Sequence, residues 1–362
     1  MAGVVIWGLL GYFGYNYYHN WRKAAAKENV PRMNPNGNEW QDDETIWITK
    51  RFIYARLVYG IYDRFKRAER YEEWWTAMQY QRVKLAAVLS EDEQEVYKDA
   101  LQYERTHKYF GVFQLTTNSP PANALKWVVA IRGTDFSRTA DLLNNLSIVF
   151  EQLNSAQLTT IVEVVVRRLV AQHGYQSVGV TGHSLGAAVG LLVCRRLALE
   201  RCLVEGHFFN PPFAHMKSLV QRLIPRVLEP TSDSVCYGIA RLKSVLLDGD
   251  TAFQRAKREF KTLAEARWYP YLYVNEYDVL CNKYLKHFEH GSADDDPEKY
   301  FSSFPHIIFW ETESFHLFPF AYLNTIRRER HIIGRFTAHK LRIWLRSDVP
   351  GRFQQVELIQ RP

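Results

Sequence analysis

The chain has 362 residues, of which 47% are hydrophobic and 14% aromatic, so it can bury a substantial core. It contains no internal repeat or low-complexity tract, which excludes a repeat architecture and favours one large α/β domain with insertions. The net charge of +7 favours anionic membrane surfaces, but the basic residues are dispersed without a nucleic-acid-binding motif, so no nucleic-acid partner is expected.

The first 30 residues form a hydrophobic segment rich in tyrosine and tryptophan, and residues 31–49 form a linker. The apolar stretch 4–18 is short for a membrane-spanning helix, no basic residue precedes it, and Arg22, Lys23 and Lys27 follow it. We therefore expect a membrane anchor that leaves the following domain in the cytosol. The alternatives are a cleaved signal peptide ending near 24–26, which would direct the chain to the secretory pathway, and a soluble cytoplasmic protein.

A buried strand is predicted at 126–131, followed by the turn Arg132-Gly133-Thr134-Asp135. An acyl-transfer site needs a donor for a developing oxyanion from such a loop, and Thr134 offers both its backbone N–H and its hydroxyl. The alternative is an ordinary glycine turn with a solvated aspartate. A helix is expected next, because Leu158, Ile161, Val162, Val165 and Leu169 form one apolar stripe.

The pentapeptide Gly182-His183-Ser184-Leu185-Gly186 lies between a predicted strand at 177–181 and an apolar helix that begins immediately afterwards. This context is typical of a nucleophile elbow, in which the serine hydroxyl projects above the sheet. The amide of Leu185, at the positive end of the helix, would then stabilise an oxyanion. The alternative is a glycine turn without a catalytic role.

A long helix-prone insertion at about 213–267 follows, with apolar residues interleaved with arginine and lysine. An amphipathic helix of this kind could serve as a lid that opens at a lipid surface. The alternative is a set of ordinary packing helices.

The orienting acid and the base should follow the serine in the chain order Ser, acid, His. We predict Asp278 as the acid, because it lies in a loop after the aromatic strand 268–274, at the carboxyl end where such sheets collect catalytic groups. Asp248 and Asp250 are weaker rivals. The histidines after Asp278 are His287, His290, His306, His316, His331 and His339. We choose His339 as base, with His316 and His331 as alternatives.

Several of these segments resemble the class 3, fungal-type lipase family of α/β-hydrolases. The resemblance is carried by Arg132-Gly133-Thr134, by 182–188 and by Val274-Asn275-Glu276-Tyr277-Asp278. The chain is more closely similar to plant α/β-hydrolases labelled GDSL esterase/lipase, although it contains no Gly-Asp-Ser-Leu. That closer likeness includes 57–62, Trp74-Trp75, 207–212 and Ala338-His339, the last of which supports the choice of base.

The resemblance covers about 50–346, leaves 347–362 as a C-terminal tail, and implies an α/β-hydrolase fold with a mostly parallel sheet and helices on both faces. It also implies a lipase or esterase that hydrolyses lipid esters, of acylglycerol or phospholipid, through a Ser-Asp-His triad. Two alternatives stay open: a small-ester carboxylesterase, and a catalytically idle lipase-like interaction protein, since some plant relatives act as scaffolds without relying on hydrolysis.

No metal or organic cofactor is expected, because the four cysteines have neither zinc spacing nor the density of a disulfide scaffold. They are Cys194, Cys202, Cys236 and Cys281, and free thiols in a reducing compartment are the simplest interpretation. The expected partners are a lipid ester substrate and a membrane or lipid-droplet surface.

Overall fold

The computed structural model describes residues 43–63, 75–76, 78–117, 124–133, 156–213, 255, 257–278, 280–290, 318–326, 338–346 and 351–358. The chain divides into two units, 1–40 and 41–362, and every described residue belongs to the second. Within these ranges no helix is both long and apolar enough to cross a membrane. The segment predicted as an anchor lies outside the described residues.

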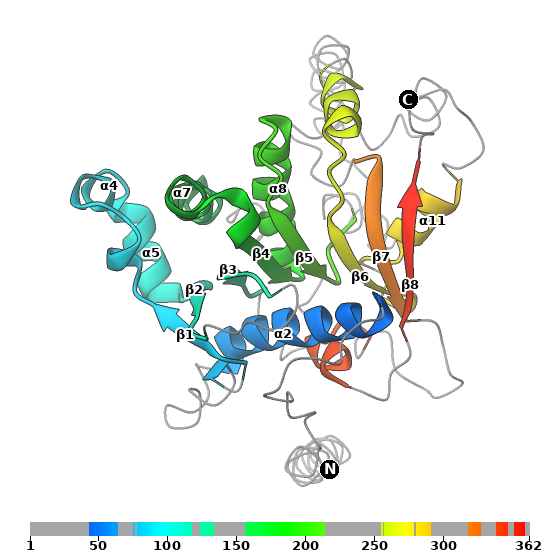
Figure 1. The fold of residues 1–362 in the computed structure, drawn as a ribbon, viewed down its shortest axis with the longest axis horizontal. Coiled ribbons are helices and arrows are strands. Elements are labelled where there is room, and N and C mark those ends of the chain that lie inside the picture. Colours follow the sequence, from blue (N-terminus) through cyan, green and yellow to red (C-terminus); the bar gives the residue numbers. More distant parts are fainter. Residues whose placement is uncertain are drawn as a thin grey trace, which may run out of the picture. The chain divides into compact units, whose positions relative to one another are not determined.

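One eight-stranded sheet forms the centre of the fold, and its strands are neighbours in chain order (Figure 1). The strands are β1 (Tyr80–Val83), β2 (Phe110–Leu115), β3 (Trp127–Ile131), β4 (Val178–His183), β5 (Glu205–Phe209), β6 (Tyr271–Asn275), β7 (Phe320–Ile326) and β8 (Arg352–Glu357). From β3 to β7 every pairing is parallel, whereas the pairings of β1, β2 and β8 are antiparallel. The predicted mostly parallel α/β sheet is confirmed.

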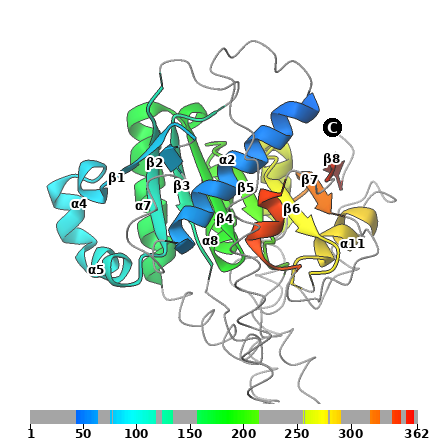
Figure 2. The same ribbon diagram turned by 90° about the horizontal axis from the view of Figure 1, so that it is seen from below.

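The helices cover both faces of this sheet. They are α2 (Asp43–Asp63), α4 (Glu91–Val96), α5 (Lys98–His107), α7 (Ala156–His173), α8 (Leu185–Leu199) and α11 (Lys283–His290), with short 3₁₀ turns η1 (Leu85–Ala87), η2 (Tyr175–Ser177) and η4 (Leu341–Leu345). Right-handed crossovers between successive parallel strands place their helices on one face. Accordingly α7 and α8 lie together on one face, and α2 crosses the strands on the other (Figures 1 and 2).

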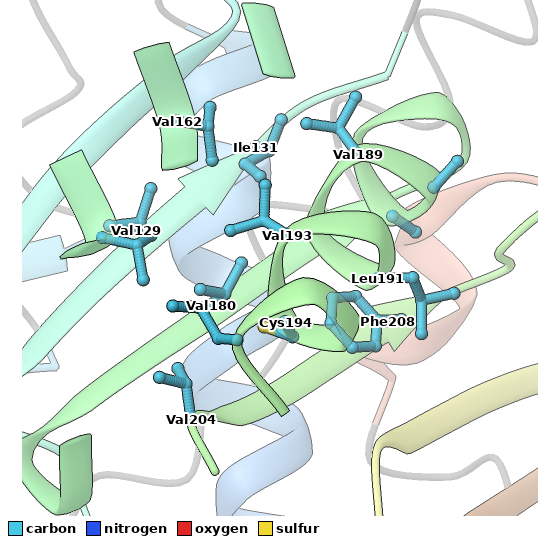
Figure 3. Packing of buried hydrophobic residues seen from close by; sticks show 14 of the residues in the cluster. Val129, Ile131, Val162, Val180, Val189, Leu191, Val193, Cys194, Val204 and Phe208 are labelled. Carbon is cyan, nitrogen blue, oxygen red and sulfur yellow. The ribbon is translucent and has the colours of Figure 1, made fainter. Parts of the chain in front are cut away.

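The main core lies between α8 and the central strands. Figure 3 shows Val189, Val193 and Cys194 of the helix packed toward Val180 and Phe208 of the sheet, and all five are buried. Small residues allow the close approach, since the first turns of α8 contain Gly186, Ala187, Ala188 and Gly190. Fully burying aliphatic side chains of this size stabilises a fold by about 1.5–3 kcal/mol each, so this layer holds the start of α8 rigidly against the sheet.

A polar cluster fills the opposite face, between α2 and strands β5 and β6. Lys50 donates to both carboxylate oxygens of Glu205 at 2.9 and 3.0 Å, and the Tyr54 hydroxyl donates to the same carboxylate at 3.3 Å. His207 lies between Glu205 and the Tyr273 hydroxyl, with contacts of 2.9 Å to each. Because buried polar groups need such partners, this cluster fixes α2 in one position on the sheet.

The domain extends beyond the predicted bounds of 50–346, which need correction at both ends. Helix α2 begins at Asp43, inside the stretch assigned to a linker, and β8 lies inside the stretch assigned to a tail, where it pairs with β7. The aromatic strand begins at Tyr271 rather than Trp268, because Pro270 lacks the N–H that a central strand needs. In the insertion at about 213–267, residues 257–266 are helical and most of the remainder lies outside the described residues.

Candidate active site

Ser184 lies on the sharp turn between β4 and α8, as the pentapeptide predicts. Its φ of 55° and ψ of −123° are strained for a residue with a side chain. The two glycines permit this turn, since a Cβ on Gly182 would overlap the backbone of Gly186, and one on Gly186 would overlap the carbonyl oxygen of Ile131. The predicted strand, turn and helix are thus present, and their geometry is that of a nucleophile elbow.

His339 contacts the serine from a segment just before η4. Its Nε2 lies 2.7 Å from Ser184 Oγ, a hydrogen-bonding distance. Among the other histidines considered, His287 is buried in α11, where its ring packs against Phe213 and Phe288. The side chain of His290 and the whole of His306, His316 and His331 lie outside the described residues.

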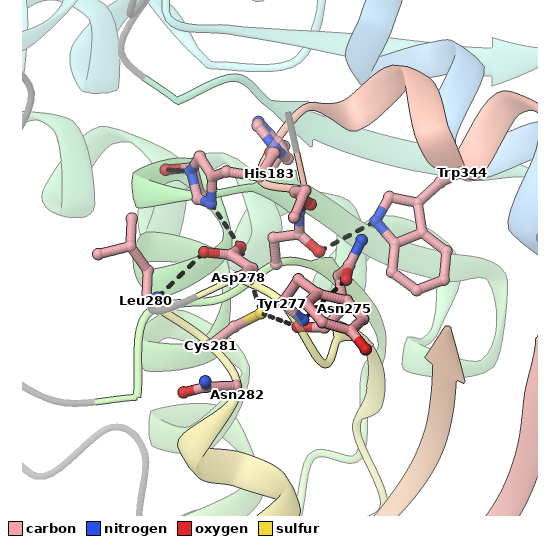
Figure 4. Close-up of polar contacts among 12 residues, drawn as sticks. His183, Asn275, Tyr277, Asp278, Leu280, Cys281, Asn282 and Trp344 are labelled. Carbon is pink, nitrogen blue, oxygen red and sulfur yellow. Dashed lines mark hydrogen bonds and ion pairs between the residues drawn. The ribbon is translucent and has the colours of Figure 1, made fainter. Parts of the chain in front are cut away.

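Asp278 follows β6 and contacts the other side of the imidazole, with 2.6 Å between its Oδ2 and His339 Nδ1. Its carboxylate also accepts the Leu280 amide at 3.0 Å and the Cys281 thiol at 3.3 Å (Figure 4). Burial alone would raise the pKa of Asp278, but the His339 charge and these hydrogen bonds outweigh it and lower the pKa below its ordinary value. The carboxylate therefore stays ionised. Asp248 and Asp250, the rival candidates, lie outside the described residues.

The His339 segment is held by two side chains to which sequence reasoning gave no role. Asn210, after β5, donates from Nδ2 to the carbonyl of Ala338 at 3.1 Å and accepts the indole N–H of Trp344 at 3.0 Å. His183 lies 2.8 Å from the carbonyl of His339 through Nε2. Asn210 lies in the stretch 207–212 that carries the closer likeness to the plant proteins, but only packing shows what the asparagine contacts.

Of the two predicted oxyanion donors, Leu185 and Thr134, only Leu185 lies within the described residues. Leu185 is the first residue of α8, so its backbone N–H has no helical carbonyl to donate to and lies at the positive end of the helix. Thr134 is outside the described residues, although its neighbour Gly133 is described and approaches Ser184 closely.

This arrangement can activate a nucleophile. A serine hydroxyl bonded to an imidazole, which is bonded in turn to a buried carboxylate, is the constellation that transfers the serine proton during acyl transfer. Ser184, Asp278 and His339 are only 2%, 1% and 7% exposed, so water is largely excluded from the proton path. Among the described side chains, no group of three or more His, Cys, Asp or Glu could hold a metal ion.

Comparisons with known proteins match part of the chain, including the segment around Ser184. The model of the family described as Lipase (class 3) matches residues 124–203, which contain β3, α7, β4 and α8. An Arabidopsis thaliana protein named GDSL esterase/lipase is 31% identical over 173 residues, which are 46% of this chain and 49% of that protein. The chain thus spans about half the length of this curated relative. No solved structure matches the chain significantly.

The sheet, the elbow and the family match together indicate an α/β-hydrolase fold. More narrowly, residues 124–203 are similar to the class 3 lipase family, in agreement with the resemblance seen in the sequence.

Proposed function

We propose that this protein is a serine hydrolase that cleaves carboxylic esters of lipids through an acyl-enzyme on Ser184. The observation that carries the proposal is the hydrogen-bonded chain from Ser184 Oγ through His339 to Asp278, with distances of 2.7 and 2.6 Å. The similarity of residues 124–203 to the class 3 lipase family and the name of the Arabidopsis relative support ester hydrolysis as the reaction.

In the proposed cycle, His339 Nε2 takes the Ser184 proton as Oγ attacks the ester carbonyl carbon. The Asp278 carboxylate stabilises the imidazolium, and the Leu185 amide, with Thr134 as second donor, stabilises the oxyanion. The C–O bond to the alcohol then breaks, and His339 gives its proton to the leaving oxygen. Water, deprotonated by His339, then attacks the acyl carbon; the bond from that carbon to Ser184 Oγ breaks, His339 returns its proton to Oγ, and the acid is released.

Ser184, Asp278 and His339 are buried. We therefore expect a covering segment to move before a lipid substrate enters the site. We propose that the insertion at about 213–267 supplies this cover and opens at a membrane or lipid-droplet surface. Residues 1–30 would attach the protein to that membrane with its catalytic domain in the cytosol. Recovery of the full chain in the soluble fraction of its native cells after lysis would contradict the attachment.

Hydrolysis of a graded series of p-nitrophenyl esters and of emulsified acylglycerol and phospholipid tests the function. The wild type should release acid, and its activity should rise as the substrate passes from monomers to aggregates. Ser184→Ala and His339→Ala should each lower kcat by about 10⁴-fold or more. Activity that is equal on monomers and aggregates would indicate a small-ester carboxylesterase. A folded wild type that is inactive on every substrate would favour an idle, lipase-like interaction protein.

A further inference from the structure

A chain of three hydrogen bonds joins the loop after β3 to the backbone of His339 through two side chains, Tyr62 and His183. The amide of Gly133 lies 2.7 Å from the Tyr62 hydroxyl, which lies 2.8 Å from His183 Nδ1. His183 Nε2 lies 2.8 Å from the carbonyl oxygen of His339. Tyr62 belongs to the last turn of α2, so a helix on the far face of the sheet contacts the segments around the nucleophile.

The direction of every bond in this chain is fixed by its two ends. A backbone amide can only donate, so Tyr62 Oη accepts from Gly133; a carbonyl can only accept, so His183 Nε2 must carry a proton. Burial, together with the neighbouring His339 charge, lowers the pKa of His183 to about 3, so its ring is neutral and Nδ1 bears a lone pair. The Tyr62 hydroxyl therefore donates its single proton to Nδ1.

The chain of hydrogen bonds begins at Gly133, whose backbone lies close to the nucleophile. A Cβ on Gly133 would lie 2.9 Å from the Cβ of Ser184, 2.7 Å from the carbonyl oxygen of His183 and 2.8 Å from the Tyr62 hydroxyl. Real Cβ atoms do not approach so closely, so this position has no room for a side chain. The Gly133 backbone therefore lies close to both Ser184 and Tyr62, one residue before the proposed donor Thr134.

Ring packing holds the two side chains that carry the chain. The Tyr62 and His183 rings meet edge to face with 5.7 Å between centroids, and the His183 and His339 rings lie 5.1 Å apart. The Tyr62 ring centre also lies 5.8 Å from the Arg132 guanidinium, and that cation lies 4.9 Å from the ring centre of Tyr109. These contacts help to hold the two rings in the orientation that the hydrogen bonds require.

We infer that Tyr62 and His183 are positioning residues that hold the Gly133 backbone and the His339 backbone in register with Ser184. Tyr62 fixes the loop that leads to the proposed oxyanion donor, and His183 fixes the segment that carries the base. The inference rests on the proposed hydrolysis, and it adds residues from outside the triad to the machinery of that reaction. Misplacement of reacting groups by about 1 Å can lower rates by about 100-fold.

The first test replaces the tyrosine hydroxyl and measures kcat and KM separately on a soluble short-chain ester. Tyr62→Phe should lower kcat by about 10- to 100-fold and leave KM within about twofold. The matched control is Tyr175→Phe, which removes a hydroxyl from a partly exposed tyrosine in η2, just before the opposite end of β4. A folded Tyr62→Phe protein whose kcat stays within about twofold of the wild type would overturn the inference.

A second pair of variants separates hydrogen bonding from packing at His183. Glutamine offers one acceptor and one donor group, as the neutral ring does, so His183→Gln should retain most of the activity, whereas His183→Leu should lose about as much as Tyr62→Phe or more. Adding Tyr62→Phe to His183→Leu should cause little further loss, because the chain is already broken. Equal losses in His183→Gln and His183→Leu, or fully additive losses in the Tyr62→Phe/His183→Leu double variant, would contradict a shared chain.

A spectroscopic test is independent of activity. In spectra of the protein labelled with ¹⁵N-histidine, His183 should carry its proton on Nε2 and remain neutral from pH 8 to about pH 5, as its lowered pKa requires. Tyr62→Phe should shift the Nδ1 resonance toward that of a nitrogen without a hydrogen bond. A proton on His183 Nδ1, or an Nδ1 resonance that Tyr62→Phe does not shift, would contradict the chain of hydrogen bonds even if the wild type is active. An inactive wild type that shows the predicted spectra would instead contradict the proposed hydrolysis and leave the hydrogen bonds in place.

Discussion

Cys281 lies completely buried beside the carboxylate that contacts His339. Burial, with the nearby charge of Asp278, raises the pKa of its thiol well above the ordinary value, so the group stays protonated and donates to Asp278 Oδ2 (Figure 4). The Cys281 thiol and the Leu280 amide, which donates to Oδ1, together orient the Asp278 carboxylate toward the imidazole N–H of His339. A thiol is a weak donor, so its contribution to the orientation of Asp278 should be modest.

Replacing this thiol should therefore reduce activity only slightly. We expect Cys281→Ala to lower kcat a few-fold, because one hydrogen bond to the carboxylate is lost and a small cavity remains. Cys281→Ser, which keeps a donor, should retain more activity, as measured by steady-state ester hydrolysis. Cys202→Ala, at a half-buried thiol just after α8, serves as the control. Greater activity in the alanine variant than in the serine variant would contradict the assigned role.

The residues of the candidate site differ in how far the sequence predicts them. Ser184 and Leu185 follow from a local pattern, because the glycines and the flanking strand and helix are adjacent in the chain. Asp278 and His339 depend on chain order and on a family resemblance, since their contacts join residues 61 and 155 positions apart. Tyr62, His183 and Asn210 could not be assigned a role, because their bonds form only after three segments pack together.

At the scale of single elements, α2 shows why a buried helix can be missed. Its inner face carries Lys50, Arg51 and Arg56, all less than a tenth exposed, and these cations interrupt the apolar stripe by which an amphipathic helix is recognised. The residues before them in the helix, 43–49, are predicted from the sequence as the end of a linker. The helix is stable in this position because Glu205 accepts from both Lys50 and Tyr54.

Removing the cation of the Lys50–Glu205 ion pair should destabilise the fold. Lys50→Met leaves the Glu205 carboxylate partly buried without its cation, and we expect a loss of about 2–3 kcal/mol in the free energy of unfolding, measured by urea denaturation. The exposed pair Lys98–Glu95 provides the control, since its side chains are 66% and 75% exposed, and Lys98→Met should cost less than about 0.5 kcal/mol. A Lys50→Met protein as stable as the wild type would contradict the role given to the cluster.

At the scale of the whole molecule, three fully buried neutral histidines should make the fold sensitive to acid. Burial lowers the pKa of His183 and of His287 to about 3, and that of His207 to about 4. In the unfolded chain these groups take up protons below about pH 6.5. Unfolding is therefore increasingly favoured as the pH falls from about 6.5 toward 4, by about 1.4 kcal/mol per pH unit for each proton taken up.

Denaturation midpoints measured between pH 7.5 and pH 4.5 test this dependence. His287→Leu should be less steeply destabilised by acid than the wild type, because one proton uptake is removed, whatever its stability at neutral pH. His173→Gln is the matched control, because His173 is exposed at the end of α7 and should leave the slope unchanged. An unchanged slope in His287→Leu would show that this histidine is already protonated in the folded protein.

The sheet as a whole was predictable in its centre and not at its edges. Strand β3 is a continuous apolar run, and β4 and β5 are buried along nearly their whole length, which is typical of parallel strands buried on both faces. Strand β8 (Arg352–Glu357) is mostly polar and has no buried side chain, so only its pairing with β7 reveals that it belongs to the sheet. For this reason the stretch 347–362 was assigned to a tail.

Ser184 is proposed to be a nucleophile that His339 activates. Labelling of the purified protein with a fluorophosphonate probe, with the adduct located by mass spectrometry, tests it most directly. The wild type should carry the adduct on Ser184, and the label should disappear in Ser184→Ala and His339→Ala while Tyr175→Phe labels normally. A folded wild type that does not label even in the presence of detergent or lipid would contradict the activation of Ser184. Equal labelling of the wild type, Ser184→Ala and His339→Ala would contradict it as well.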